Sequence, residues 1–169
     1  MASTTIPHRA WVEQVMGMPV SVHVRGQAAR ADDTARLVYA AFEELRVIDA
    51  RFSTYSADSE VSRLNRAELS LAAVHPSMSE VLELCEVARK RTGGHFNAHC
   101  PDPAAHGERR FDPSGLVKGW AIEQMAARLA RSTGCDVSVN AGVTSPETRA
   151  ASLERPGGSA WRTPDNRLG

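Results

Sequence analysis

The sequence predicts an α+β fold in which a mixed sheet packs against helices. Three valines, Val20, Val22 and Val24, alternate with polar residues, which is the period of a strand with one buried face. Elsewhere, apolar residues recur at spacings of three and four, the period of an amphipathic helix. Segments rich in glycine and proline separate these two patterns, so strands and helices share one chain.

Three strands follow from the alternating pattern. The first two, residues 12–16 and 19–24, are joined at Gly17, and the third covers residues 136–140. The order of the strands in the sheet is left open by the sequence.

Helical periodicity predicts four helices, at residues 32–52, 58–65, 79–91 and 116–132. Glycine follows the last two helices, at Gly93 and Gly134, where it is typical of a helix end. Cys85 lies on the apolar side of its helix and is interpreted as a buried small side chain. Residues 95–111 contain several prolines and glycines and are predicted to form a loop.

Composition excludes several classes of function. Twenty basic residues balance twenty acidic ones, and only 5% of residues are aromatic, so a nucleic-acid-binding surface is not expected. The beginning of the chain lacks the apolar core of a signal peptide, and no run approaches the ~20 apolar residues of a membrane span. Three widely spaced cysteines form neither a disulfide framework nor a metal pair, so we expect a cytoplasmic protein.

The segment from Phe111 to Trp120 is the most informative for chemistry. Asp112 precedes a turn of small residues that leads into a helix with Lys118 in its first turn. Backbone N–H groups at a helix start, together with a lysine, suit a phosphate-containing ligand. Asp112 could cap the helix, contact a ligand or orient a metal-bound group, and an ordinary turn with a capping residue explains the same residues.

Four stretches of the sequence together resemble the ApbE family of flavin transferases. They are Met16-Gly17-Met18, the block Phe52-Ser53-Thr54-Tyr55 with Ser59-Glu60-Val61 and Leu64-Asn65, the turn Thr92–Asn97, and the segment Phe111–Trp120. Each motif is weak alone, but the four occur in the family's order with helices between them. The resemblance implies an α+β fold of the ApbE type, related to the T-fold.

The resemblance also implies roles for individual residues. The residues that would line an FAD site or contact its phosphates are Met16, Tyr55, His95, Phe96, Asn97, Asp112 and Lys118, and the carbonyl group of Gly115 would face a magnesium ion. The family reaction breaks the pyrophosphate of FAD, attaches FMN to a threonine of an acceptor protein through a phosphoester bond, and releases AMP. Mg²⁺ would neutralise charge on the transferred phosphoryl group.

Two departures from the family pattern stand out. Asn97 occupies a position where the family usually has Asp, and Gly142 continues into Val143 where a second glycine and an aspartate are expected. We therefore interpret residues 1–142 as the N-terminal part of the domain and residues 143–169 as a divergent, disordered tail. A frameshift or a naturally short relative would explain why the expected C-terminal half, with its acidic and threonine magnesium ligands, is missing.

Two alternatives to the enzymatic interpretation stay open. A short domain of this kind could be a non-catalytic remnant that binds flavin or folds poorly. Separately, the ligand types His95, His99, Cys100 and His106 suit zinc, although a segment rich in proline and glycine does not place them on one helical face.

Overall fold

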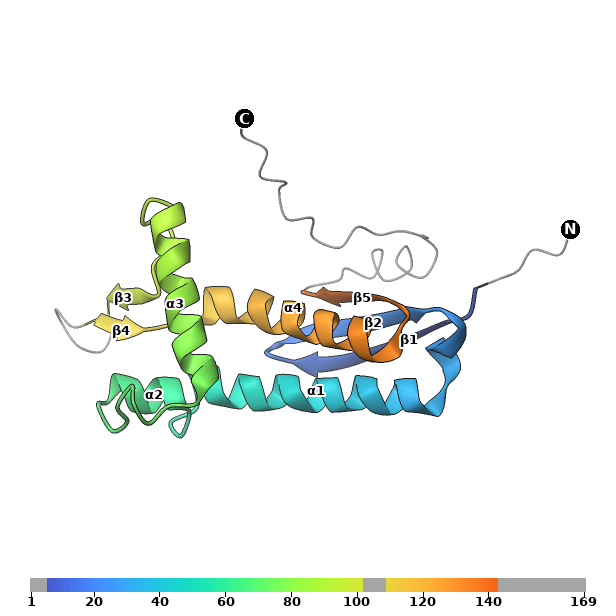
Figure 1. The fold of residues 1–169 in the computed structure, drawn as a ribbon. Helices are drawn as coiled ribbons and strands as arrows, with labels where there is room; N and C mark the ends of the chain where they lie inside the picture. Colours follow the sequence, from blue (N-terminus) through green and yellow to red (C-terminus); the bar gives the residue numbers. More distant parts are fainter. Residues whose placement is uncertain (1–5, 102–108, 143–169) are drawn as a thin grey trace, which may run out of the picture. The chain divides into compact units, whose positions relative to one another are not determined.

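The computed structural model describes residues 6–101 and 109–142. The predicted tail at 143–169, as well as His106, lies outside these described residues. The elements along the chain are β1 (His8–Val15), β2 (Met18–Arg25), the 3₁₀ turn η1 (Gln27–Arg30), α1 (Asp32–Phe52), α2 (Glu60–Asn65), α3 (Pro76–Arg91), β3 (His99–Pro101), β4 (Arg109–Phe111), α4 (Ser114–Thr133) and β5 (Asp136–Ala141) (Figure 1). The predicted α+β class is confirmed.

The chain divides into two compact units, and each is described by itself. Among the described residues, the sheet unit comprises 6–42 and 125–142, and the helical unit comprises 43–101 and 109–124. The long helices α1 and α4 each contribute one end to each unit. Within residues 6–101 and 109–142, none of the helices combines the length and the apolar character that a membrane span requires.

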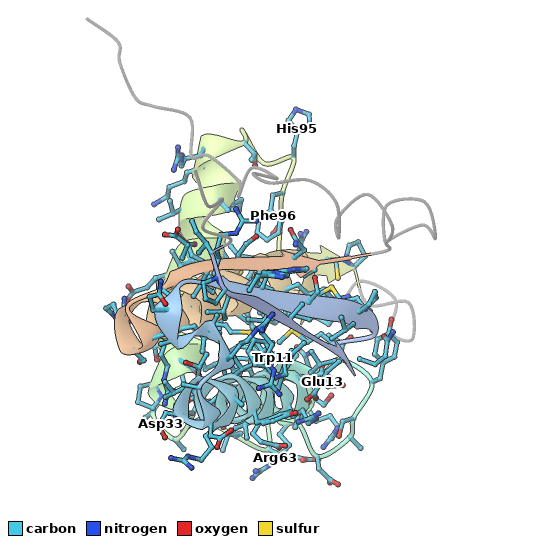
Figure 2. All side chains as sticks on the ribbon, turned by 90° about the vertical axis from the view of Figure 1, so that its right-hand side faces the viewer. Trp11, Glu13, Asp33, Arg63, His95 and Phe96 are labelled. Atoms are coloured by element: carbon cyan, nitrogen blue, oxygen red, sulfur yellow. The ribbon has the colours of Figure 1, made fainter. Side chains whose placement is uncertain are left out.

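The sheet unit contains a three-stranded sheet in the order β1-β2-β5, and both neighbouring pairs are antiparallel. Val20, Val22 and Val24 are fully buried, as the alternating pattern predicts. Trp11 pairs with Val22 in this register, and its ring is buried on the same face of the sheet. Trp11 and Glu13, two residues apart in β1, point to this face (Figure 2). Helix residues of this unit, such as Val38 and Leu129, supply the rest of its core.

The connection between β1 and β2 is a two-residue hairpin turn. Val15 pairs with Met18, so Met16 and Gly17 are the turn residues, with φ angles of 56° and 70°. Positive φ at both positions is the geometry that fits the twist of a hairpin. The predicted strand at 12–16 therefore ends one residue early and begins at His8, because the turn takes up Met16.

Capping residues explain where the helices of the helical unit begin. Ser59 accepts a hydrogen bond from the backbone N–H of Ser62 and caps α2, close to the predicted start. Helix α3 begins at Pro76, earlier than predicted, because the His75 side chain accepts from the N–H of Ser77 and proline suits the first helical position.

The C-terminal end of α3 confirms its predicted glycine stop. Gly93 has a φ of 60°, and its N–H donates to the carbonyl of Lys90. The N–H of Gly94 donates to the carbonyl of Arg89, which completes the pair of hydrogen bonds typical of this kind of helix end.

The prediction that residues 95–111 form a loop is wrong in part. Three-residue strands β3 and β4 pair antiparallel, with His99 opposite Phe111. Such short strands escape sequence analysis because three residues are too few to show an alternating pattern, and Pro101 argues against a strand.

Candidate functional site

The loop that carries Tyr55 is held in place by serine side chains. The Ser53 hydroxyl oxygen accepts hydrogen bonds from the N–H groups of Tyr55 and Ser56, at 3.2 and 3.1 Å. The hydroxyl of the buried Ser59 donates to the carbonyl of Ser53 at 2.6 Å. The Tyr55 side chain is nevertheless 99% exposed, so a fixed backbone presents a ring to solvent.

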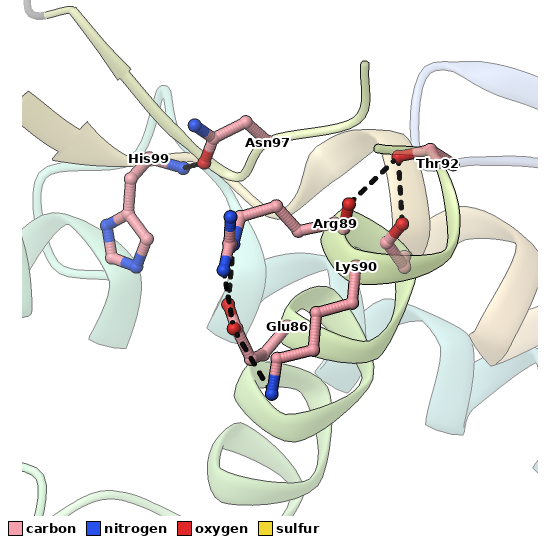
Figure 3. Close-up of polar contacts among 7 residues, drawn as sticks. Glu86, Arg89, Lys90, Thr92, Asn97 and His99 are labelled. Atoms are coloured by element: carbon pink, nitrogen blue, oxygen red, sulfur yellow. Dashed lines mark hydrogen bonds and ion pairs between the residues drawn. The ribbon is translucent and has the colours of Figure 1, made fainter. Parts of the chain in front are cut away.

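The turn after α3 is organised by Thr92. Its hydroxyl donates to the carbonyl of Ala88 at 2.9 Å and accepts from the N–H of Phe96 at 3.0 Å. Figure 3 shows the hydroxyl of Thr92 among the last carbonyl groups of the helix, and the Asn97 side chain accepting from the N–H of His99. The imidazole of His95 points away from the ribbon at the outer end of this turn (Figure 2).

A charged network covers the last turns of α3 beside this segment. Glu86 pairs with Arg89 at 2.8 Å and with Lys90 at 3.6 Å (Figure 3). Hydrogen bonding to Arg89 lowers the pKa of the Glu86 carboxyl to about 2. The network is exposed, so it contributes little to the stability of the helix.

Asp112 lies where β4 leads into α4. Its N–H donates to the carbonyl of Ala98 at 2.7 Å, which ties it to the turn after α3. One carboxylate oxygen accepts from the N–H of Ser114 at 3.0 Å, and the other lies 3.5 Å from the Arg110 guanidinium. Of the roles left open by the sequence, helix capping is therefore present in the structure.

The capping bonds limit what else the start of α4 can bind. The carbonyl of Pro113 accepts hydrogen bonds from the N–H groups of Leu116 and Val117. The carboxylate of Asp112 accepts one from the N–H of Ser114. Most of the free N–H groups expected at a helix start are thus engaged within the chain. A phosphate group would have to rely on the exposed Lys118 rather than on this N-terminus alone.

Phe96 and Gly115 bring the two segments together. A Cβ atom added to Gly115 would lie 3.4 Å from Cε2 of the Phe96 ring, an ordinary van der Waals distance. The turn at 95–98 and the segment at 112–115 therefore form one small group, joined by this contact and by the Ala98–Asp112 hydrogen bond. Tyr55 and Lys118 lie in the same unit, whereas Met16 lies in the sheet unit.

Met16 differs from the other candidate residues in its backbone conformation. It is one of two non-glycine residues with positive φ among the described residues, and its side chain is 5% exposed. Positive φ costs a residue with a Cβ about 1 kcal/mol or more, and such outliers gather at functional sites. The residue types that favour this turn, glycine and asparagine, would avoid the cost.

Metal-binding clusters are missing from the part of the chain that the structure describes. No three His, Cys, Asp or Glu side chains come together there, so His95, His99 and Cys100 form no zinc site within it. Oxygen atoms near the start of α4 come from the carboxylate of Asp112 and from backbone carbonyls such as that of Gly115. In a helix that carbonyl normally accepts from the N–H four residues later, which leaves one lone pair for a cation.

One residue of the site was missed by sequence analysis. The side-chain amide of Asn65 forms two hydrogen bonds with the backbone of Phe111, directly before Asp112. Asn65 belongs to one of the family-like motifs, but nothing in its sequence position indicates a partner 46 residues away.

Comparison with known proteins assigns the chain to a family. The model of the ApbE family matches residues 16–102, more than half of the sequence. The chain belongs to the ApbE family. The match includes Met16, Tyr55 and the turn at 95–97, and it ends before Asp112. No curated protein matches the sequence.

Solved structures of ApbE proteins share the fold. The flavin transferase ApbE from Vibrio cholerae aligns with a TM-score of 0.64 and 18% identity, covering 80% of this chain and 57% of that one. The ApbE protein from Thermotoga maritima aligns with a TM-score of 0.64 and 14% identity, covering 80% and 57%. The apo flavinyl transferase ApbE from Pseudomonas stutzeri aligns with a TM-score of 0.63 and 18% identity, covering 85% and 58%. The chain thus spans less than two thirds of the length of these proteins.

Proposed function

We propose that the chain takes part in magnesium-dependent transfer of FMN from FAD to a threonine of an acceptor protein, with release of AMP. The observation that carries the proposal is the group formed by the Phe96 turn and the Asp112–Gly115 segment in a member of the ApbE family. Solved structures of the same fold belong to proteins named flavin transferases.

Side chains of the helical unit suit a nucleotide that has both a flat ring system and phosphates. Tyr55 offers an exposed aromatic ring, and Phe96 offers a half-buried one, so both are suited to contact an isoalloxazine or adenine ring. Lys118 is an exposed cation one turn into α4, where it can neutralise a phosphate. His95, Asn97 and Met16 are proposed to complete the FAD contacts.

A magnesium ion suits the donor in kind, because the donor is an oxygen. The carbonyl of Gly115 would face the ion, Asp112 would contact the cofactor, and the ion would supply neutralisation of charge on the pyrophosphate. Mg²⁺ takes six oxygen ligands and keeps several waters, so phosphate oxygens and water would complete its coordination. Asp112 would have to release or share its bond with the N–H of Ser114.

The direct test is incubation of the purified chain with FAD, MgCl₂ and a threonine-containing acceptor peptide. Released AMP is measured by chromatography, and peptide-bound flavin by fluorescence and mass. We expect stoichiometric AMP and flavinylated peptide, both reduced at least tenfold in Asp112→Asn. If the folded wild-type chain yields neither AMP nor flavinylated peptide, the proposed transfer activity is refuted.

A second function, flavin binding without transfer, is favoured by one observation. The chain covers only 57–58% of the three solved ApbE proteins compared above, so groups used for transfer in those proteins could lie in the part that has no counterpart here. Saturable FAD binding without AMP release in the same experiment would select this alternative.

A further inference from the structure

We propose that Asn65 is a positioning residue that holds Asp112 in place through the backbone of Phe111. The inference rests on the proposed function, because it gives Asn65 a role in the same site.

Asn65 binds both backbone groups of a single residue. Its side-chain Nδ2 donates to the carbonyl of Phe111 at 2.9 Å, and its Oδ1 accepts from the N–H of Phe111 at 2.8 Å. Both distances are normal for strong amide hydrogen bonds. The side-chain amide therefore acts as a one-residue substitute for a neighbouring strand.

The register of the hairpin explains why Phe111 needs such a partner. Asp112 donates to Ala98 on the β3 side, and in an antiparallel pair alternate residues direct their N–H and C=O groups to opposite sides. The backbone groups of Phe111 thus face away from β3, at the open edge of β4. Phe111 is 6% exposed, so an unpaired N–H and C=O at this edge would be costly.

The two sets of bonds restrain Asp112 from both sides. Ala98 holds its own N–H, and Asn65 holds the residue immediately before it. Helix α2, which carries Asn65, is itself anchored by the Ser59 cap and the Ser59–Ser53 hydrogen bond. Loss of the Asn65 amide removes one of these two restraints on the backbone, and the carboxylate of Asp112, which contacts Ser114 N–H and Arg110, then samples orientations other than the one that binds the ligand.

The test compares Asn65→Ala with Ser62→Ala, a polar-to-alanine change on the same helix; the two side-chain hydrogen bonds to the Phe111 backbone come from Asn65. FAD affinity is measured in the presence of Mg²⁺ for both variants, in the wild-type and Asp112→Asn backgrounds. We expect Asn65→Ala to weaken FAD binding about tenfold, the size of one or two lost hydrogen bonds, and Ser62→Ala to leave it unchanged.

Comparing the effect of Asn65→Ala in the two backgrounds distinguishes a positioning role from a general loss of stability. If Asn65 acts through Asp112, its tenfold penalty disappears in the Asp112→Asn background, because no carboxylate remains to be positioned. An equal penalty in both backgrounds would overturn the proposal. Asn65→Asp keeps the acceptor for Phe111 N–H and loses the donor, so it serves as the second variant if Asn65→Ala does not fold.

Amide exchange in the ligand-free protein tests the positioning role of Asn65 independently of FAD binding. Amide hydrogen exchange of Phe111 and Ser114 is followed by NMR in the ligand-free protein. Asn65→Ala is expected to speed exchange at both amides, since the Asp112 cap on Ser114 loosens with Phe111. Unchanged exchange at Ser114 would refute the positioning role, whether or not the wild-type chain binds FAD.

Discussion

Single residues with positive φ mark two different situations in this chain. Met16 has its side chain buried in a hairpin turn of the predicted flavin site, whereas Ala67 ends α2 in an exposed position with a φ of 55°. The N–H of Ala67 donates to the carbonyl of Leu64, and that of Glu68 donates to the carbonyl of Arg63. This helix end has the same pair of bonds as the end of α3, where Gly93 occupies the equivalent position.

The two helix ends therefore predict opposite effects of reciprocal substitutions. Ala67→Gly is expected to raise the free energy of unfolding by about 1 kcal/mol, because glycine adopts positive φ without steric cost. Gly93→Ala is expected to lower it by a similar amount. Urea denaturation followed by circular dichroism measures both changes. A stabilising Gly93→Ala would show that this geometry is not what ends α3.

Cys85 differs from the other two cysteines in its burial. Its side chain is 5% exposed in α3, and burial raises the pKa of its thiol to about 11. Because the folded pKa exceeds the ordinary value of 9.0, the associated stability is present below pH 9 and is lost as pH rises from there towards 11. The thiolate is the reactive form, so a buried thiol of raised pKa reacts slowly.

We predict that a thiol reagent at pH 8 modifies Cys100 and Cys135, which are partly exposed, well before Cys85. Mass spectrometry of peptides after timed labelling gives the order. In denaturant all three should react at similar rates, which controls for the intrinsic reactivity of each sequence context. Rapid native labelling of Cys85 would mean that α3 opens readily.

At the scale of elements, capping decides where the short helix α2 forms. Six residues are too few for a helix to be stable alone, so its cap and its tertiary contacts must hold it. Ser59 serves both purposes, since its hydroxyl oxygen accepts a hydrogen bond from the N–H of Ser62 and its O–H donates one to the carbonyl of Ser53.

Ser59→Ala is accordingly expected to lower the free energy of unfolding by about 1–2 kcal/mol. Thermal unfolding measures the loss, and the exposed Ser70→Ala is the matched control with a change near zero. Because α2 carries Asn65, the Ser59 variant should also speed amide exchange at Phe111. If Phe111 exchange stays at the wild-type rate, then Asn65 does not depend on the cap.

The elements that could be predicted from sequence are those with a repeating pattern. All four helices and the three strands of the sheet appear near their predicted positions, because burial of Val22 or Val38 leaves a periodic signal. The hairpin β3–β4 and the Asn65–Phe111 bonds left no such signal, since they depend on backbone groups that every residue has. The candidate site residues were proposed from family resemblance, whereas the contacts among them are visible only in the structure.

For the whole molecule, the division into two units separates Met16 from the other predicted site residues. If Met16 contacts FAD as proposed, ligand binding affects the sheet unit as well as the helical unit. Binding should then raise the thermal unfolding temperature of the chain and slow exchange at Met16 as well as in the helical unit. Exchange protection confined to the helical unit would remove Met16 from the proposed site.

The predicted domain boundary at residue 142 can be tested on the whole chain. Removing residues 143–169 is expected to leave FAD binding and thermal unfolding unchanged within error, if residues 1–142 hold all of the domain present in this chain. Calorimetry of the shortened and full chains makes the comparison. A loss of binding on removal would assign these residues to the site.

The helical unit of this ApbE family member is proposed to bind FAD around Phe96, Asp112 and Gly115. The measurement that tests it most directly is calorimetric titration of the folded chain with FAD and Mg²⁺, alongside Asp112→Asn and Gly115→Ala. We predict saturable one-to-one binding that Asp112→Asn weakens at least tenfold. Gly115→Ala should retain binding, because its Cβ fits beside Phe96 and its carbonyl is kept. Absence of saturable binding, or equal binding by Asp112→Asn and wild type, would rule out an FAD site around Asp112.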